Sequence, residues 1–396
     1  MQGLIYLDNA ATAFPKPKVV YDFMHEFYQK RGVNPGRSGY DMCMEAEEVV
    51  FSTRKMLTRF FNGTDPNHLT FSYNATDSLN MIIQGMLEEG DHAITTKVEH
   101  NSVLRPLNHL EHDGVIEVTR IPFDEKGYVH PDDVKKAIRN DTKMVIVNHG
   151  SNVIGTVQPI GEIGKVCREA GVYFAVDSSQ TAGTLPIDVQ EMAIDLLAFT
   201  GHKSLMGPTG IGGSYVGVDV PIRATRSGGT GVKSAYPFHL EEFPYRLEYG
   251  TLNVMGVAGL HAAQKWIEEQ GMASIHSREM ALWDKLRRGI ENIEGVVTYC
   301  AESSENHNAV LSFNIVGWEA ADVGTMLDVD YDIACRTGLQ CAPLVHEQLG
   351  TDAIKGTVRL SIGAFNTEEH IDKAIQAVAE IASTQRKQPE RMRVTD

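Results

Sequence analysis

The chain has 396 residues and a formal net charge of −16 at pH 7, since 52 acidic residues outnumber 36 basic ones. Such a charge argues against non-specific nucleic-acid binding, because it repels phosphates. The sequence contains no run of about 18 apolar residues, so we predict no membrane-spanning helix. Its five cysteines show no metal-type pairing, so we predict free thiols, no metal site and a cytoplasmic location.

Short apolar runs alternate with helical patterns along the first part of the chain. We predict strands at residues 68–73, 93–96, 143–148, 172–177, 196–200 and 211–216. Helical patterns lie between several of them, at residues 45–61, 77–87, 102–111, 132–138 and 161–170. Strands that alternate with helices in this way predict an α/β fold with a mostly parallel sheet.

After about residue 255 the pattern changes to two long helices followed by shorter strands and helices, which predicts a smaller α+β domain. We therefore divide the chain into three parts. Residues 1–16 form an N-terminal segment that packs with the small domain, residues 17–260 form the large domain, and residues 261–396 form the small C-terminal domain.

Two charged residues stand near the ends of predicted strands. Lys203 follows the strand at residues 196–200, and Asp177 ends the strand at residues 172–177. Ligands of parallel sheets bind beyond the carboxyl ends of the strands. A lysine and an acid there are what pyridoxal 5′-phosphate (PLP) requires, because the lysine forms a Schiff base and the acid pairs with the pyridinium nitrogen. A buried ion pair between the two, without a cofactor, explains the pattern equally well.

Four polar residues near the same strand ends suit such a cofactor. Thr76 lies where a strand joins a helix, whose first N–H groups can hold a phosphate, although an ordinary N-cap gives the same pattern. His100 can stack on a planar ring and relay protons, and Asn152 and Gln180 offer amides to the ring. The alternatives are a satisfied loop histidine for His100 and a plain turn for Asn152.

Eight stretches of the chain resemble, in order and spacing, the class V aminotransferase family of fold-type I PLP enzymes, and within it the cysteine desulfurases. They are residues 6–12, 34–38, 98–102, 151–155, 177–183, 201–203, 248–253 and 336–342. The resemblance runs from about residue 4 to about residue 385. It implies a large PLP-binding domain with a mostly parallel seven-stranded sheet, and a smaller C-terminal α+β domain that carries a catalytic cysteine loop.

The resemblance implies a role for each matching residue. Lys203 would be the Schiff-base lysine, Asp177 would hold the pyridinium proton, and His100 would stack on the ring and assist proton transfer. The other expected cofactor contacts are Asn152 and Gln180 at the ring oxygen and Ala75, Thr76, Thr200 and His202 at the phosphate. The residues expected to reach the phosphate of a partner subunit, in a homodimer with shared sites, are Gly250 and Thr251.

The resemblance also implies a substrate-binding set. It comprises Ala11, Asn34, Arg37, Asn152, Arg336 and Arg359. Among these, Arg359 would grip the substrate carboxylate, because a guanidinium can bind a carboxylate through two parallel hydrogen bonds.

Cys341 decides which reaction the resemblance implies. It follows a polar, glycine-containing stretch and precedes a predicted helix start, so we predict a loop; a buried and inert core cysteine is the alternative. As the nucleophile, Cys341 would take the sulfur of L-cysteine as a persulfide, leave L-alanine, and pass the sulfur to an acceptor protein. We predict that Cys43, Cys167 and Cys335 are structural.

Within the desulfurases the chain resembles the second, SufS/CsdA-like group. It departs from that group at one place, because the group usually has two histidines before the cysteine where this chain has Leu339 and Gln340. The loop is also short, so we expect Cys341 to stay ordered and persulfide release to need an activating partner. The sequence leaves open whether the substrate is cysteine or selenocysteine. It also leaves open whether the protein serves iron–sulfur assembly, tRNA thiolation or selenium metabolism. The alternatives are a selenocysteine lyase, another PLP-dependent C–S lyase or aminotransferase of this fold, and a non-catalytic scaffold in sulfur transfer.

Overall fold

The computed structural model describes residues 3–36 and 38–384, and within them the larger sheet has seven strands in the order β2-β8-β7-β6-β5-β3-β4. Only β8 runs antiparallel to its neighbours, so the sheet is mostly parallel as predicted. The strands are β2 (Leu69–Ser72), β3 (His92–Thr96), β4 (Glu117–Ile121), β5 (Thr142–Asn148), β6 (Tyr173–Asp177), β7 (Leu196–Thr200) and β8 (Gly212–Val216).

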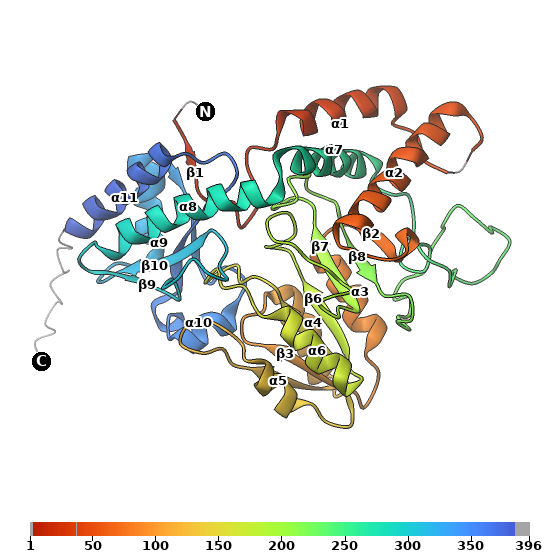
Figure 1. Cartoon of the computed structure of the whole chain (residues 1–396), viewed down its shortest axis with the longest axis horizontal. Helices are drawn as coiled ribbons and strands as arrows, with labels where there is room; N and C mark the ends of the chain where they lie inside the picture. The colour runs from red at the N-terminus through yellow and green to blue at the C-terminus, as the bar shows by residue number, and fades with distance from the viewer. Residues whose placement is uncertain (1–2, 37, 385–396) are drawn as a thin grey trace, which may run out of the picture.

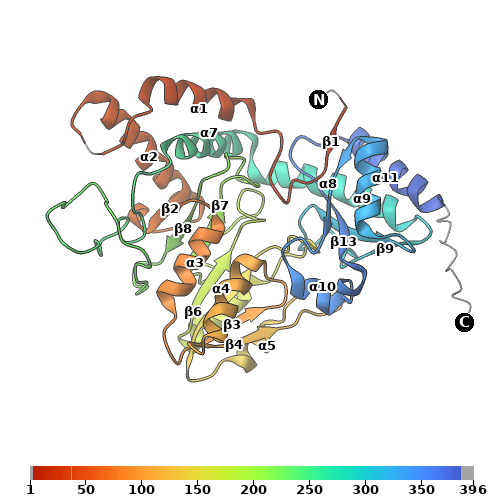
Figure 2. The ribbon, with the colours of Figure 1, turned by 180° about the vertical axis from the view of Figure 1, so that it is seen from behind.

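Helices cover both faces of this sheet. In β5, Val145 and Val147 belong to one core cluster and Met144 and Ile146 to another, as the two-residue period of a strand requires. Figure 1 shows α6 in front of the sheet, and Figure 2, from behind, shows α3 and α4 on the other side. The helices are α1 (Lys18–Arg31), α2 (Asp41–Phe60), α3 (Ala75–Met86), α4 (Asn101–His112), α5 (Pro131–Ala137), α6 (Ile160–Ala170) and α7 (Val254–Gln270).

A second, antiparallel sheet in the order β12-β13-β10-β9 forms the core of the C-terminal part, together with helices α8, α9 and α11. Trp283, Phe313 and Leu360 lie fully buried in this core. Its strands are β9 (Val296–Thr298), β10 (Val310–Ile315), β12 (Arg336–Gly338) and β13 (Thr357–Ser361). Its helices are α8 (Met272–Glu291), α9 (Ala320–Tyr331), α10 (Pro343–Leu349) and α11 (Glu368–Ser383).

The N-terminal segment joins this second core. Strand β1 (Ile5–Tyr6) pairs in parallel with β11 (Ile333–Ala334), and the backbone N–H of Ser361 donates to the carbonyl oxygen of Leu7 at 2.7 Å. The segment then turns toward the large sheet, where Ala13 N–H donates to the carbonyl oxygen of His202 at 3.0 Å. It therefore bridges the two parts of the molecule.

The packing of helices α7 and α8 indicates that the boundary between the two parts of the molecule lies later in the chain than residue 260. Helix α7 contacts α1 and α2, and Ile267 near its end still belongs to the large-domain core, whereas Met280 in α8 belongs to the small-domain core. Ile275 in the first turns of α8 also belongs to the large-domain core, so we propose a boundary within α8, between Ile275 and Met280, rather than at residue 260 (Figure 1). Within the described residues, no helix combines the length and the apolarity needed to cross a membrane.

Candidate active site

A cavity of about 240 Å³ lies beyond the carboxyl ends of β5, β6 and β7, where the two parts of the molecule meet. Most of the predicted site residues line it. Those residues are Ala11, Ala75, Thr76, His100, Asn152, Asp177, Gln180, Thr200, His202, Lys203, Arg336, Cys341 and Arg359. Parallel strands bring the residues that follow them to one edge, which accounts for strand-end residues such as Asp177 and Lys203, whereas Ala11, Arg336, Cys341 and Arg359 were expected from the family resemblance.

Three predicted residues that the structure describes are not brought to this cavity, namely Asn34, Gly250 and Thr251. Asn34 and Gly250 line a different cavity of about 270 Å³, beside the buried ion pair of Arg54 and Glu248. Thr251 follows Gly250 in the chain and lines neither cavity, and Arg37 lies outside the described residues. The predicted roles of Asn34, Gly250 and Thr251 stay predictions, since these residues do not line the cavity of their own chain.

Lys203 lies half-buried in the cavity, and its ammonium makes no hydrogen bond or ion pair with any residue that the structure describes. Burial lowers the pKa of Lys203 to about 8, while the nearby charge of Asp177 opposes this shift. Asp177 instead accepts hydrogen bonds from the backbone N–H and hydroxyl of Ser179 at 2.9 and 2.5 Å. The buried Lys–Asp ion pair considered above is therefore not formed, and the amine is available for chemistry.

The predicted phosphate-binding residues form a cradle with unused polar groups. Helix α3 begins at Ala75, and the Asn74 side chain caps only the N–H of Asp77, so the first N–H groups have no partner within the helix. The Thr200 hydroxyl and His202 Nδ1 are buried without a hydrogen-bond partner among the described residues. Buried polar groups beside a helix N-terminus fit a phosphate, whose oxygens would satisfy them.

His100 is held as a neutral imidazole with a defined tautomer. The backbone N–H of Ser102 donates to His100 Nδ1 at 3.0 Å, so Nδ1 is the acceptor and the ring proton sits on Nε2. Burial, and after it the charge of Lys203, lowers the pKa of His100 to about 4. The Ser102 hydroxyl also contacts Thr76 Oγ1 at 2.6 Å, which ties the ring to the start of α3.

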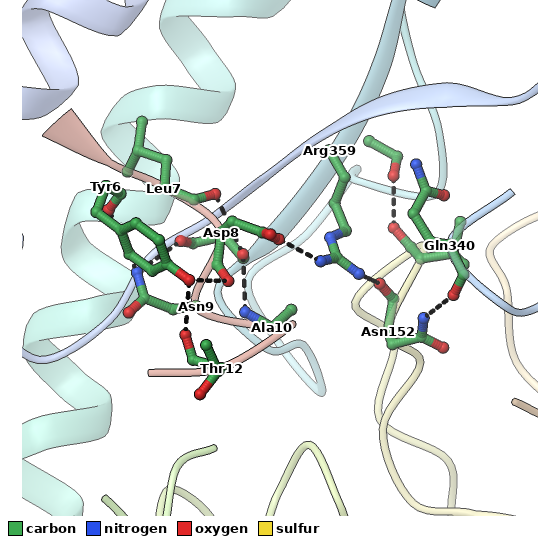
Figure 3. Close-up of polar contacts among 12 residues, drawn as sticks. Tyr6, Leu7, Asp8, Asn9, Ala10, Thr12, Asn152, Gln340 and Arg359 are labelled. Atoms are coloured by element: carbon green, nitrogen blue, oxygen red, sulfur yellow. Dashed lines mark hydrogen bonds and ion pairs between the residues drawn. The ribbon is translucent and has the colours of Figure 1, made fainter. Parts of the chain in front are cut away.

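Arg359 is held in place by two oxygen atoms (Figure 3). Its Nη2 pairs with Asp8 Oδ1 at 2.6 Å and its Nη1 donates to the backbone oxygen of Asn152 at 2.8 Å. Its Nε is buried without a partner in the described part of the chain. Burial lowers the pKa of Arg359, and Asp8 opposes that shift. Asp8 was assigned no role from the sequence, although it comes shortly after a strand, and Asp177 likewise stands at a strand end.

Cys341 is exposed in the cavity, unlike a core cysteine, and it lies in an unusual turn. Gln340 and Cys341 have φ angles of 41° and 61°, in the left-handed region that non-glycine residues rarely adopt. The turn is fixed by Asn101 N–H, which donates to the Cys341 carbonyl oxygen, and by Asn152 Nδ2, which donates to the Gln340 carbonyl oxygen, both at 2.7 Å. The stretch before it is not all loop as predicted, because residues 336–338 pair with β13 as strand β12.

The Gln340 side chain supports this turn from inside the protein. Its Nε2 donates to the backbone oxygen of Thr357 at 2.8 Å, which leaves Oε1 to accept from His346 Nε2 at 3.0 Å. His346 Nδ1 then accepts from the Thr351 hydroxyl at 2.8 Å. Burial lowers the pKa of His346 to about 4, so the imidazole is neutral and this hydrogen-bond direction is fixed. We call the Gln340, His346, Thr351 and Thr357 contacts the turn clamp.

The chain is similar to class-V aminotransferases and, among them, to cysteine desulfurases. The family model of class-V aminotransferases matches residues 5–374. A probable cysteine desulfurase of Methanothermobacter thermautotrophicus is 32% identical over 96% of this chain and 94% of its own length. The apo structure of a cysteine desulfurase from Thermococcus onnurineus has a TM-score of 0.89 at 33% identity, over 96% of this chain and 94% of that one. The cysteine desulfurase CsdA of Escherichia coli, in an S-sulfonic acid form, has a TM-score of 0.86 at 28% identity, over 96% and 94% of the two chains.

Proposed function

The chain belongs to the class-V aminotransferase family, and on that basis we propose that it is a PLP-dependent cysteine desulfurase, which converts L-cysteine to L-alanine and passes the sulfur on. One observation carries this proposal beyond the family. The exposed thiol of Cys341 lines the same cavity as the unpaired amine of Lys203. An aminotransferase needs only the amine, whereas sulfur transfer needs a thiol beside it.

The residues of the cavity suit PLP, which when bound acts as an electron sink for bonds at the substrate α-carbon. Lys203 would hold the cofactor covalently, and Asp177 would hold the proton on its ring nitrogen. The phosphate would lie at the start of α3, where it would satisfy the unused groups of Thr200 and His202. His100, Asn152 and Gln180 line the remaining wall for the ring, where Gln180 Nε2 donates to the backbone oxygen of Ala10 at 2.9 Å and leaves its second N–H and its oxygen for other contacts.

Each of three side chains has a separate role in the proposed reaction. Arg359, already oriented by Asp8 and Asn152, binds the carboxylate of L-cysteine. Lys203 takes the α-proton, and because burial lowers its pKa to about 8, more of its amine is unprotonated than in an ordinary lysine at the same pH. The Cys341 thiolate attacks the substrate sulfur, so a sulfur–sulfur bond forms while the carbon–sulfur bond breaks and its electron pair stays with carbon. Protonation of that carbon and return of the α-proton from Lys203 give L-alanine, and Cys341 keeps the persulfide.

The second cavity supports a homodimer. Asn34 and Gly250 lie together there and away from their own active-site cavity, so we propose that they, with Arg37 and Thr251, complete the site of a partner subunit. A cytoplasmic location fits the five cysteines, all of which lie in the described residues as free thiols. The acceptor that receives the sulfur is a protein thiol.

Alanine release tests the proposal. The purified protein is loaded with PLP and given L-cysteine, or L-selenocysteine in a parallel reaction, and alanine is measured for wild type and for Cys341→Ala. We expect wild type to form alanine from L-cysteine and the variant to lose nearly all of this activity. Full cysteine activity in the variant would favour a lyase that needs no persulfide, as would a reaction restricted to L-selenocysteine. A protein that fails to develop the absorbance of bound PLP would favour a scaffold.

A further inference from the structure

Cys341 also borders a second opening, on the outer side of helices α3 and α4. This opening is a groove of about 410 Å³, whose wall includes Asn80, Gln84, Arg105, Pro106, His109 and Cys341. We call it the α3–α4 groove; the two helices lie side by side in Figure 2. It shares Thr76, His100, Ser102 and Cys341 with the active-site cavity. A single sulfur atom therefore stands between a cavity that suits a small amino acid and a separate surface groove.

The groove is electrostatically distinct from the rest of the molecule. None of its described lining residues is acidic, although the chain as a whole carries a net charge of −16. Arg105 is exposed and makes no hydrogen bond or ion pair with any described residue, whereas the nearby Arg120 is paired with Glu111 at 2.5 Å. His109 lies one helical turn beyond Arg105 on the same helix face. The groove thus offers an unpaired positive charge beside the Cys341 sulfur.

We propose that the α3–α4 groove receives the sulfur acceptor, as a protein segment that presents a thiol flanked by acidic side chains. Arg105 pairs with these carboxylates, and His109 adds a second polar contact. This inference rests on the proposed desulfurase function and names the partner of the same site. An acidic partner is repelled by most of this acidic chain, so a local positive charge also guides it to Cys341.

The transfer step needs no further reagent. The acceptor thiolate attacks the terminal sulfur of the Cys341 persulfide and forms a new sulfur–sulfur bond. The bond between that sulfur and Cys341 Sγ breaks, and Cys341 leaves as a thiolate. The persulfide moves to the acceptor without any net oxidation or reduction.

Two matched peptides test this groove without knowledge of the natural acceptor. The PLP-loaded protein is first converted to the Cys341 persulfide with one equivalent of L-cysteine. The rate of sulfur transfer is then measured to acetyl-Glu-Cys-Glu-amide and to acetyl-Gln-Cys-Gln-amide. We expect Arg105→Gln to slow transfer to the acidic peptide by about fivefold, the effect of one exposed charge pair, and to leave the neutral peptide unchanged. Added salt reduces the difference.

Arg278→Gln is the matched control, because Arg278 is also exposed and unpaired among the described residues but lies on α8, outside the groove. The proposal is overturned if Arg105→Gln slows both peptides equally, or if Arg278→Gln has the same effect on the acidic peptide. The persulfide yield before peptide addition separates the two claims. No persulfide in wild type contradicts the desulfurase proposal, whereas normal persulfide without a charge effect contradicts only the groove.

Discussion

Replacing Gln340 by leucine should break the turn clamp while nearly preserving side-chain volume. Gln340 Nε2 now satisfies the buried carbonyl oxygen of Thr357, and Gln340 Oε1 satisfies His346 Nε2. Leucine removes both hydrogen bonds and leaves the Thr357 carbonyl oxygen without this donor, while His346 keeps its backbone contact with Leu339. An unpaired buried group costs about 1–3 kcal/mol, so we expect Gln340→Leu to lower the free energy of unfolding by about 1–3 kcal/mol.

The same change should displace the nucleophile. Gln340 and Cys341 both hold left-handed φ angles, which cost about 1–2 kcal/mol per residue and persist only while neighbouring contacts impose them. Without the clamp the turn relaxes and the thiol moves from its place in the cavity. A shift of about 1 Å is enough to slow a positioned reaction about a hundredfold, so we expect that loss in the rate of persulfide formation, with L-cysteine binding unchanged.

Urea unfolding and single-turnover quench measurements check the two effects. Gln264→Leu is a suitable control, because Gln264 is equally buried in α7 but both of its amide atoms lack a partner among the described residues. Leucine there removes unpaired polar atoms, so we expect no loss of stability. The reasoning about the clamp is refuted if Gln340→Leu unfolds at the same urea concentration as wild type and forms the persulfide at the wild-type rate.

Three further predictions follow from the site and the core. The apo protein should bind PLP faster as the pH rises through about 8, because only the neutral amine of Lys203 attacks an aldehyde. A rate of PLP binding whose pH midpoint lies near the ordinary lysine pKa of 10.5 would contradict this prediction. Arg359→Lys should raise the KM for L-cysteine at least about tenfold, because an ammonium cannot bind Asp8, Asn152 and a carboxylate in the same planar geometry; an unchanged KM would show that another group binds the carboxylate. Burial raises the pKa of Glu279 from 4.5 to about 8. At pH values between these two, the folded protein binds a proton that the unfolded chain lacks. The free energy of unfolding therefore falls as the pH rises through this range. Glu279→Gln should therefore be more stable than wild type at pH 9 and lose this advantage toward pH 5, whereas a difference constant with pH in thermal melts would exclude the titration.

The strand-end residues of the large domain were predictable because two local signals coincide. Apolar runs such as residues 172–177 and 196–200 are strands buried on both faces, and the polar residues after them must reach the carboxyl edge. Strand β4 was missed because it is an edge strand whose Glu117 and Arg120 interrupt the apolar pattern. Helix α1 was missed because it buries only Val20 and Phe27 fully, which leaves little helical periodicity.

The contacts that prepare the site had no local signal. Asp8 and Arg359 are 351 positions apart, and only the folded chain brings the N-terminal segment beside β13. Gln340 appeared in the sequence as a departure from the usual histidine, and its role depends on His346 in the following helix and on Thr357 in the next strand. Both the Asp8–Arg359 pair and the hydrogen bonds of Gln340 depend on the direction in which each side chain points. The spacing of residues in the sequence does not give that direction.

The central claim is that Cys341 holds the sulfur between the amino acid and the acceptor. Mass spectrometry of the Cys341 peptide, after one turnover with sulfur-isotope-labelled L-cysteine and trapping by alkylation, tests it most directly. We predict that this peptide gains one labelled sulfur atom in step with alanine formation, and that the peptides of the other four cysteines gain none. Alanine formed while the Cys341 peptide stays unmodified would contradict the account.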